Sequence, residues 1–140
     1  MQPHKYRQGI IGNCAYLAHI NQEADVSWMC WPKFDSSFIF GNLLDDEKGG
    51  HFYVKPNSND YTCNQYYITN TNILCTEFNA PDGKFRVTDF APRFHQYERN
   101  FKPLMLFRKI EPLEGDPEIV VSCEPVGDYG NIKPESFIGS

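Results

Sequence analysis

The sequence has no long hydrophobic run, no excess of positive charge and no closely spaced pair of cysteines or histidines. No apolar stretch approaches the roughly 20 residues that a membrane-spanning helix needs. The 13 Lys and Arg residues against 18 Asp and Glu residues give a net charge of −5, which is unlike the basic surface of a nucleic-acid-binding protein. We therefore expect neither a membrane nor a nucleic acid as a partner.

Motifs for metal, redox and nucleotide chemistry are also missing. The five cysteines form no Cys-x-x-Cys motif, and the four histidines show no metal-ligand spacing. There is no Gly-x-Ser-x-Gly elbow and no phosphate-binding glycine loop. We expect no metal, no cofactor, and cysteines that are mostly buried free thiols. The odd cysteine count, the lack of an Asn-x-Ser/Thr sequon and the lack of an apolar leader after residues 1–6 favour a cytoplasmic location.

What the sequence does contain is enough apolar and aromatic side chains for one folded domain. It has 140 residues, of which 41% are hydrophobic and 15% aromatic. Short apolar runs are separated by Gly, Pro and polar turns, which predicts an all-β, antiparallel β-sandwich. The predicted strands cover residues 14–20, 26–31, 52–54, 66–68, 73–78, 84–90, 104–110 and 118–123.

One segment is predicted to be helical. The run 38–44 is crowded with apolar residues, Ser36 could cap it, and Gly49 and Gly50 follow it. We expect one short helix near residues 37–45, with the acidic residues 45–47 at its end. The polar segment 131–140 has no periodicity and is predicted to be a tail or the start of a linker after a β-domain of residues 1–130.

Two strand patterns predict how side chains are buried. Val26, Trp28 and Cys30 recur with a period of two, which predicts that they share one core-facing side of a strand, with Trp28 as an anchor. The run 104–107 is apolar at every position, which is typical of a strand that is covered on both faces.

Few Asp and Glu residues lie in positions where a catalytic role would be expected. A sugar hydrolase needs two of them across a cleft. The cluster Asp45, Asp46 and Glu47 is interpreted as solvated, and Asp89, at a strand end, is expected to cap a turn or to form an ion pair. We therefore assign no catalytic residue in this chain.

The most unusual segment runs from Trp28 to Asp35. Two tryptophans lie beside Lys33, Phe34 and Asp35, where a predicted strand gives way to a loop. Aromatic rings next to charged groups can bind a sugar by stacking and charge-assisted hydrogen bonds. The alternative is a core Trp28 and an interface Trp31. An open Trp31 would favour a binding module, whereas Trp31 on a larger apolar patch would favour a docking face.

At this segment the chain resembles the N-terminal region of glycoside hydrolase family 15, the glucoamylase-like and trehalase-like hydrolases. The resemblance covers about nine-tenths of the chain, in the family's order. It rests on the segments 12–14, 28–36, 49–52, 71–74, 82–83, 87–92 and 128–130, with Phe40, Leu43, Leu44, Tyr67, Thr76 and Phe78.

The chain departs from the family pattern at several positions. The turn before the tryptophan strand usually reads Asp-Gly-Ser-Ile-Asp-Trp, whereas here Ala24 replaces the Gly and Ser27 replaces the second Asp. Loss of the Gly implies a different turn, and loss of the Asp removes a carboxylate. Lys33 stands where Arg is usual, which weakens any bidentate contact. Trp31, Ser37 and Thr69 replace Leu, Pro and Pro.

The resemblance implies a β-domain of the super-sandwich type, of which we expect this chain to hold the first part only, followed in such enzymes by an (α/α)₆ barrel with two catalytic glutamates. A chain filled with strands leaves no room for that barrel. The expected function is that of a non-catalytic N-terminal domain of an α-glucoside hydrolase that acts on trehalose or starch-like oligosaccharides. The domain would pack on the barrel and lend the loop with Trp31, Lys33, Phe34 and Asp35 to the active-site rim. The alternatives are a stand-alone carbohydrate-binding module and a structural domain that forms a homo-oligomer.

Overall fold

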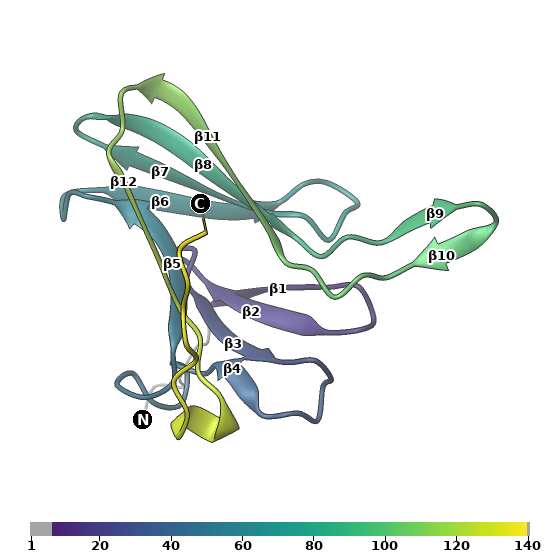
Figure 1. The fold of residues 1–140 in the computed structure, drawn as a ribbon. Helices are drawn as coiled ribbons and strands as arrows, with labels where there is room; N and C mark the ends of the chain where they lie inside the picture. The colour runs from purple at the N-terminus through teal and green to yellow at the C-terminus, as the bar shows by residue number, and fades with distance from the viewer. Residues whose placement is uncertain (1–6, 140) are drawn as a thin grey trace, which may run out of the picture.

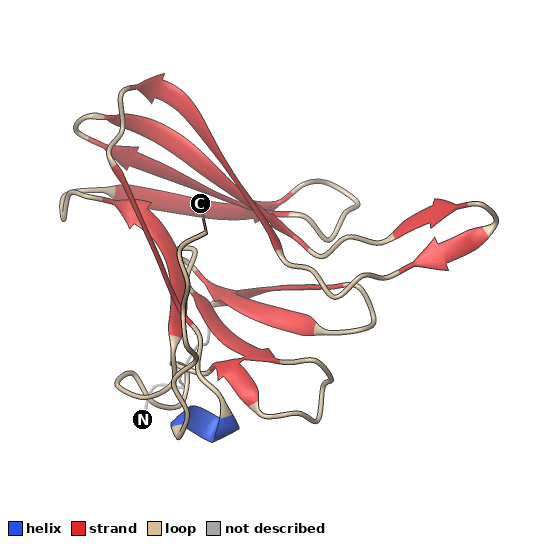
Figure 2. Ribbon diagram, viewed as in Figure 1, coloured by secondary structure: helices blue, strands red, loops and turns tan. Residues whose placement is uncertain are grey.

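The protein is described by a computed structural model covering residues 7–139, so the expectation about a leader at residues 1–6 lies outside the described residues. Within this range the chain forms strands and a single 3₁₀ turn, Asp128–Gly130, and every strand pairing is antiparallel (Figure 2). The strands are β1 (Gln8–Gly12), β2 (Leu17–Asn21), β3 (Val26–Cys30), β4 (Phe38–Phe40), β5 (His51–Pro56), β6 (Thr62–Tyr67), β7 (Leu74–Ala80), β8 (Gly83–Phe90), β9 (Phe94–Gln96), β10 (Arg99–Phe101), β11 (Phe107–Gly115) and β12 (Ile119–Glu124). The prediction of an all-β antiparallel fold is confirmed.

Two four-stranded sheets form the body of the molecule. One has the order β1-β2-β3-β4 and the other β11-β8-β7-β6. Figure 1 shows the strand pair β5–β12 running along one side of the molecule from one sheet to the other. The hairpin β9–β10 projects from the opposite side, which we call the open side.

The hydrophobic core lies where the sheets meet, and it has two clusters. The first joins β1–β4 to Leu74 of β7, and the second joins Val54 of β5 to Phe78, Phe85 and Val87 of the other sheet. In β8 the buried Phe85 and Val87 alternate with partly exposed neighbours, as the sequence pattern predicts. Residues 81–82 turn the chain between β7 and β8 in a hairpin, which is the structure that the turn-forming sequence Pro81-Asp82-Gly83 predicts.

A buried ion pair joins β8 to β11, and its arginine also contacts two segments outside that sheet. Asp89 of β8 is fully buried, and it accepts hydrogen bonds from Arg108 of β11 at 2.7 and 3.2 Å. The Arg108 guanidinium also donates to the backbone oxygens of Phe52 and Ala24, and it lies over the Phe52 ring. Of the two expectations for Asp89, the ion pair is the one that the structure confirms.

The helix predicted near residues 37–45 is wrong. Residues 38–40 form β4, in which Phe38 and Phe40 are buried on one side and pair with β3. The following residues make tight turns that are closed by the Gly41 N–H to the Gly49 oxygen at 2.6 Å. Asp45 accepts from the N–H groups of residues 47 and 48, and Gly50 adopts a φ of +70°, so a turn replaces the helix.

The predicted common face of Val26, Trp28 and Cys30 is also wrong. A bulge in β3 pairs His19 with Trp28 but Ile20 with Val26, which leaves one extra residue between them. The alternation therefore shifts, and Met29 joins Val26 in the core while Trp28 is half-buried against Phe38.

The run 104–107 is not covered on both faces. Leu104, Met105 and Phe107 are 43%, 52% and 46% exposed, and only Leu106 packs against the core.

The cysteines are all free, but Cys75 alone is buried, so the expectation of mostly buried thiols is wrong. Residues 131–139 make one β-bridge, between Gly127 and Ile132, and the boundary near residue 130 stays a prediction. No helix in the described range is long and apolar enough to cross a membrane.

Candidate functional site

The loop predicted as the functional site connects β3 to β4 on the open side of the molecule (Figure 1). Its backbone is closed by hydrogen bonds from Trp31 N–H to the Ser37 oxygen and from Ser36 N–H to the Lys33 oxygen, at 3.4 and 3.2 Å. The Ser36 hydroxyl accepts from the Lys33 N–H at 3.3 Å. Ser36 thus stabilises this loop and does not cap a helix.

Trp31 is not an open platform. It is half-buried, and its ring packs edge-on against the buried Tyr16 at 5.3 Å between centroids. It lines an apolar hollow of about 160 Å³, called here the apolar groove, with Met29, Ile39, Phe40, Phe52, Leu106 and Cys123. Stacking on a sugar needs a free ring face, so this geometry favours the docking interpretation of Trp31.

The other three residues of the predicted site lie at the surface. Lys33, Phe34 and Asp35 are exposed, and the Phe34 side chain is 55% exposed. Neither charged side chain forms an ion pair within the described range. The structure therefore places the four residues on one loop. Trp31 packs against the protein, whereas the other three side chains face solvent.

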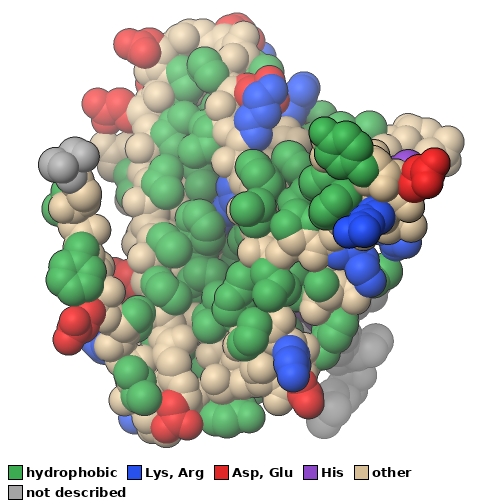
Figure 3. All heavy atoms as spheres, turned by 45° about the vertical axis from the view of Figure 1, so that its right-hand side comes forward, with side chains coloured by type: hydrophobic (Ala, Val, Ile, Leu, Met, Phe, Trp, Pro, Cys, Tyr) green, Lys and Arg blue, Asp and Glu red, His purple; other side chains and the backbone are tan. Residues whose placement is uncertain are grey.

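Next to the groove lies a larger apolar surface. The exposed Leu104 and Met105 precede Leu106, which is itself part of the groove lining, whereas Phe107 stacks on Phe90 at 5.2 Å between centroids on the other face of β11. We call Leu104 and Met105, together with the groove, the apolar face. Figure 3 shows apolar side chains gathered over the middle of the open side of the molecule.

Tyr16 holds this surface in place. Its hydroxyl donates to the Met105 backbone oxygen, and its ring contacts Trp31. Burial raises the pKa of Tyr16 to about 12. No sequence pattern indicates this role, because Tyr16 lies 89 residues from its hydrogen-bond partner.

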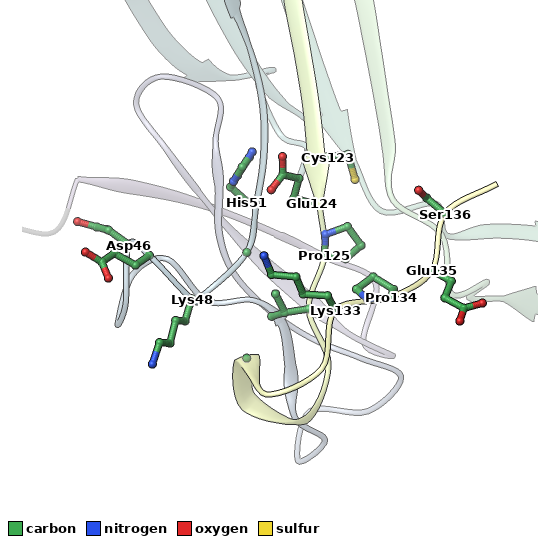
Figure 4. Close-up of a pocket in the computed structure, with 14 residues that line it drawn as sticks. Asp46, Lys48, His51, Cys123, Glu124, Pro125, Lys133, Pro134, Glu135 and Ser136 are labelled. Carbon is green, nitrogen blue, oxygen red and sulfur yellow. The ribbon is translucent and has the colours of Figure 1, made fainter. Parts of the chain in front are cut away.

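Another hollow lies between the turn 46–48, the ends of β5 and β12, and the segment 133–136 (Figure 4). It measures about 580 Å³ and is lined by charges of both signs. The His51 Nε2 is 2.8 Å from the Ser122 hydroxyl, so its ring is tied to the strand pair. The Asp46 and Glu135 side chains point away from each other in Figure 4, so these two carboxylates do not face each other across the hollow as a pair for glycoside hydrolysis would.

Comparison with known proteins links this chain to one family. A family model described as "Trehalase-like, N-terminal" matches residues 2–135. The chain is 33% identical to a trehalase of Thermoplasma volcanium over 129 residues, which cover 90% of this chain and 20% of that enzyme. It is 28% identical to a trehalase of Mycolicibacterium smegmatis over 138 residues, covering 89% and 20%.

A trehalase of Thermoplasma acidophilum is 34% identical over 112 residues, covering 78% of this chain and 19% of the enzyme. The chain thus spans about one fifth of the length of the curated relatives that it matches. No solved structure gives a significant match. Because the family model covers almost the whole sequence, the chain belongs to the family of trehalase-like N-terminal domains.

Proposed function

We propose that this chain is the non-catalytic N-terminal domain of a trehalase and that its apolar face packs on the catalytic part of the same polypeptide. The relatives that it matches are called trehalases and are about five times longer. Family 15 enzymes carry their catalytic glutamates on a helical barrel, which would be the partner. The substrate of the whole protein would then be trehalose.

The observation that carries this proposal is the exposure of Leu104 and Met105 beside the groove that Trp31 lines. Apolar patches of this kind on a soluble domain mark an interaction surface. A carbohydrate-binding module would instead present Trp31 with an open face, and the packing of Trp31 on Tyr16 speaks against that alternative.

The loop with Trp31, Lys33, Phe34 and Asp35 is proposed to lie at the active-site rim. Trp31 anchors the loop in the groove, whereas Lys33 and Asp35 extend into solvent with no partner among the described side chains. If the catalytic part covers the adjacent apolar face, these free charges come next to it. They could then donate to or accept from substrate hydroxyl groups.

A chimera tests the docking proposal. The matched 129 residues of the Thermoplasma volcanium trehalase are replaced by this chain, and trehalose hydrolysis is measured by glucose release. The chimera should be active, and Leu104→Asp or Met105→Asp should lower its melting temperature and its activity. Leu113→Asp is the matched control, because Leu113 is 47% exposed but lies away from the groove near the far end of β11. Equal effects of all three substitutions, or a folded but inactive chimera, would contradict the proposal.

The same chimera tests the loop. Asp35→Ala should lower kcat/KM about ten- to a hundred-fold, the effect of losing one charge-assisted hydrogen bond. Trp31→Ala should act in the same direction, because it frees the anchored end of the loop. Asp46→Ala, another exposed carboxylate on a turn, should change nothing. Wild-type kinetics for both Asp35→Ala and Trp31→Ala would make the loop an ordinary surface loop.

A further inference from the structure

A second hollow lies at the root of the β9–β10 hairpin, and it is separate from the loop with Trp31. It measures about 560 Å³ and is lined by three segments distant in sequence, residues 12–14, 72–73 and 90–94. Figure 1 shows the β1–β2 and β6–β7 loops on the same side as the root of the hairpin. The proposed docking of the apolar face leaves these three segments without a role.

Side-chain amides hold the three segments together. The Asn13 amide, which is 2% exposed, donates to the backbone oxygens of Pro92 and Pro103, both at 2.9 Å. The Asn72 amide donates to the Gly12 oxygen at 2.7 Å. A Cβ on Gly12 would lie 2.7 Å from the Tyr16 oxygen, so this loop requires a glycine there. The hollow is therefore pre-formed, as small-molecule sites commonly are.

Arg93 is the charged group of the hollow. Its guanidinium donates to the Cys14 sulfur at 3.3 Å, and it forms no ion pair with any described residue. Most of its N–H donors therefore have no acceptor among the residues that the structure describes. Cys14 is held at a φ of +69°, a left-handed conformation that non-glycine residues adopt rarely and that is concentrated at functional sites.

The remaining lining suits a ligand with hydroxyl groups and an apolar face. Phe90 and Phe94 line the hollow, and each has one ring face stacked on a neighbour, Phe107 and Phe101, at 5.2 and 5.3 Å between centroids, so only the other face can contact a ligand. The Asn72 side-chain oxygen has no donor assigned among the described residues. No carboxylate lines the hollow, so nothing in it favours a cation. A guanidinium can donate paired hydrogen bonds to adjacent hydroxyl groups, while C–H groups of a sugar ring pack on an aromatic ring.

We propose that this hollow binds a glucosyl unit of a neutral oligosaccharide, with Arg93 and Asn72 as the polar contacts and Phe94 as the apolar one. The choice of a sugar as the ligand class rests on the proposed trehalase function. The placement of the site, in contrast, rests on the convergence of the three segments and on the Arg93 guanidinium.

The test uses the 140-residue chain itself and two probes, trehalose and maltose. Amide chemical shifts are followed in two-dimensional NMR spectra during titration with each sugar. We expect saturable binding with a Kd of about 1 mM, centred on residues 12–14, 72–73 and 90–94. Arg93→Met should weaken binding at least about ten-fold, as expected for loss of a charge-assisted hydrogen bond. Arg99→Met, an exposed arginine on β10 outside the hollow, is the control and should bind as the unmodified chain does.

Absence of saturable binding by either sugar at concentrations of about 100 mM would overturn the proposal. So would binding that Arg93→Met leaves unchanged, or shift changes that centre on residues 31–35. Preference for trehalose over maltose, or the reverse, identifies which sugar the hollow accepts. Because the titration requires no catalytic part, failure of the trehalase chimera would leave its outcome intact, and the two proposals can fail separately.

Discussion

Replacing Arg108 by Met should strongly destabilise this domain. Arg108 is the counter-charge of the fully buried Asp89, and both side chains are almost completely inaccessible, at 4% and 0%. Removing one partner leaves an uncompensated charge in the interior, which costs about 3–5 kcal/mol. The backbone oxygens of Phe52 and Ala24 also lose their donor. Single domains are stable by only about 5–15 kcal/mol, so this change is a large fraction of the total.

The measurement is urea unfolding followed by tryptophan fluorescence, with the free energy extrapolated to water. Lys84→Met is the matched control, because the Lys84–Glu114 ion pair has side chains that are 45% and 68% exposed. It should change the free energy of unfolding by less than about 0.5 kcal/mol. Arg108→Lys keeps the charge but loses the bidentate contact and should lie between the two.

A double variant separates the loss of the pair from the cost of an unpaired charge. Arg108→Met with Asp89→Leu removes both charges, so it should be less destabilised than Arg108→Met with Asp89 intact. If Arg108→Met costs no more than Lys84→Met, or if removing Asp89 as well adds a full second penalty, the buried ion pair is not what stabilises this part of the fold.

Three further outcomes are expected. Tyr16 has its pKa raised to about 12 by burial, so the stability that its neutral form provides is present below pH 10 and is lost as the pH rises from 10 to 12. Tyr16→Phe should remove that part of the alkaline loss, as measured by urea unfolding at several pH values. Ala24→Gly should be nearly neutral in the same assay. It relieves a φ of +56°, which is worth about 1–2 kcal/mol, but it removes a buried methyl group, worth about 0.8 kcal/mol, and loosens the unfolded chain, worth about 0.4–1 kcal/mol, so the gain and the losses nearly cancel. The purified chain should release no glucose from trehalose or maltose, and activity that persists through re-purification would contradict the non-catalytic assignment.

Features that depend on neighbouring residues in the chain, such as turns and strand alternation, could be predicted from the sequence. The hairpin at residues 81–82 and the alternation in β8 follow from turn residues and from a period of two, so both could be predicted. The apolar run after Ser36 was ambiguous, because Phe38 and Phe40 fit a strand with a period of two as well as a short buried helix. Residues 38–40 form a strand because they pair with β3, and this pairing is not visible in the sequence.

The structural effects of two departures from the family pattern, Ala24 and Ser27, also could not be predicted from the sequence. The replacement of Gly by Ala24 suggested a different turn, yet Ala24 adopts the left-handed φ of +56° that a glycine favours. Ser27, in the place of a family Asp, is buried and donates to the Gln8 side chain at 2.5 Å. Both outcomes depend on partners that are distant in sequence, so the substitutions alone could not indicate them.

The candidate site was only half predictable. The composition of residues 31–35 identified an unusual loop, but whether Trp31 faces solvent or the protein depends on Tyr16, which holds both Trp31 and the Met105 backbone from another strand connection. The wrong expectation for residues 104–107 is informative in its own right. Their pattern is that of a strand covered on both sides, whereas Leu104 and Met105 lie open in this chain. A sequence that places apolar residues at exposed positions beside an apolar groove fits a surface that a partner covers, and the catalytic part of a trehalase is the partner that we propose.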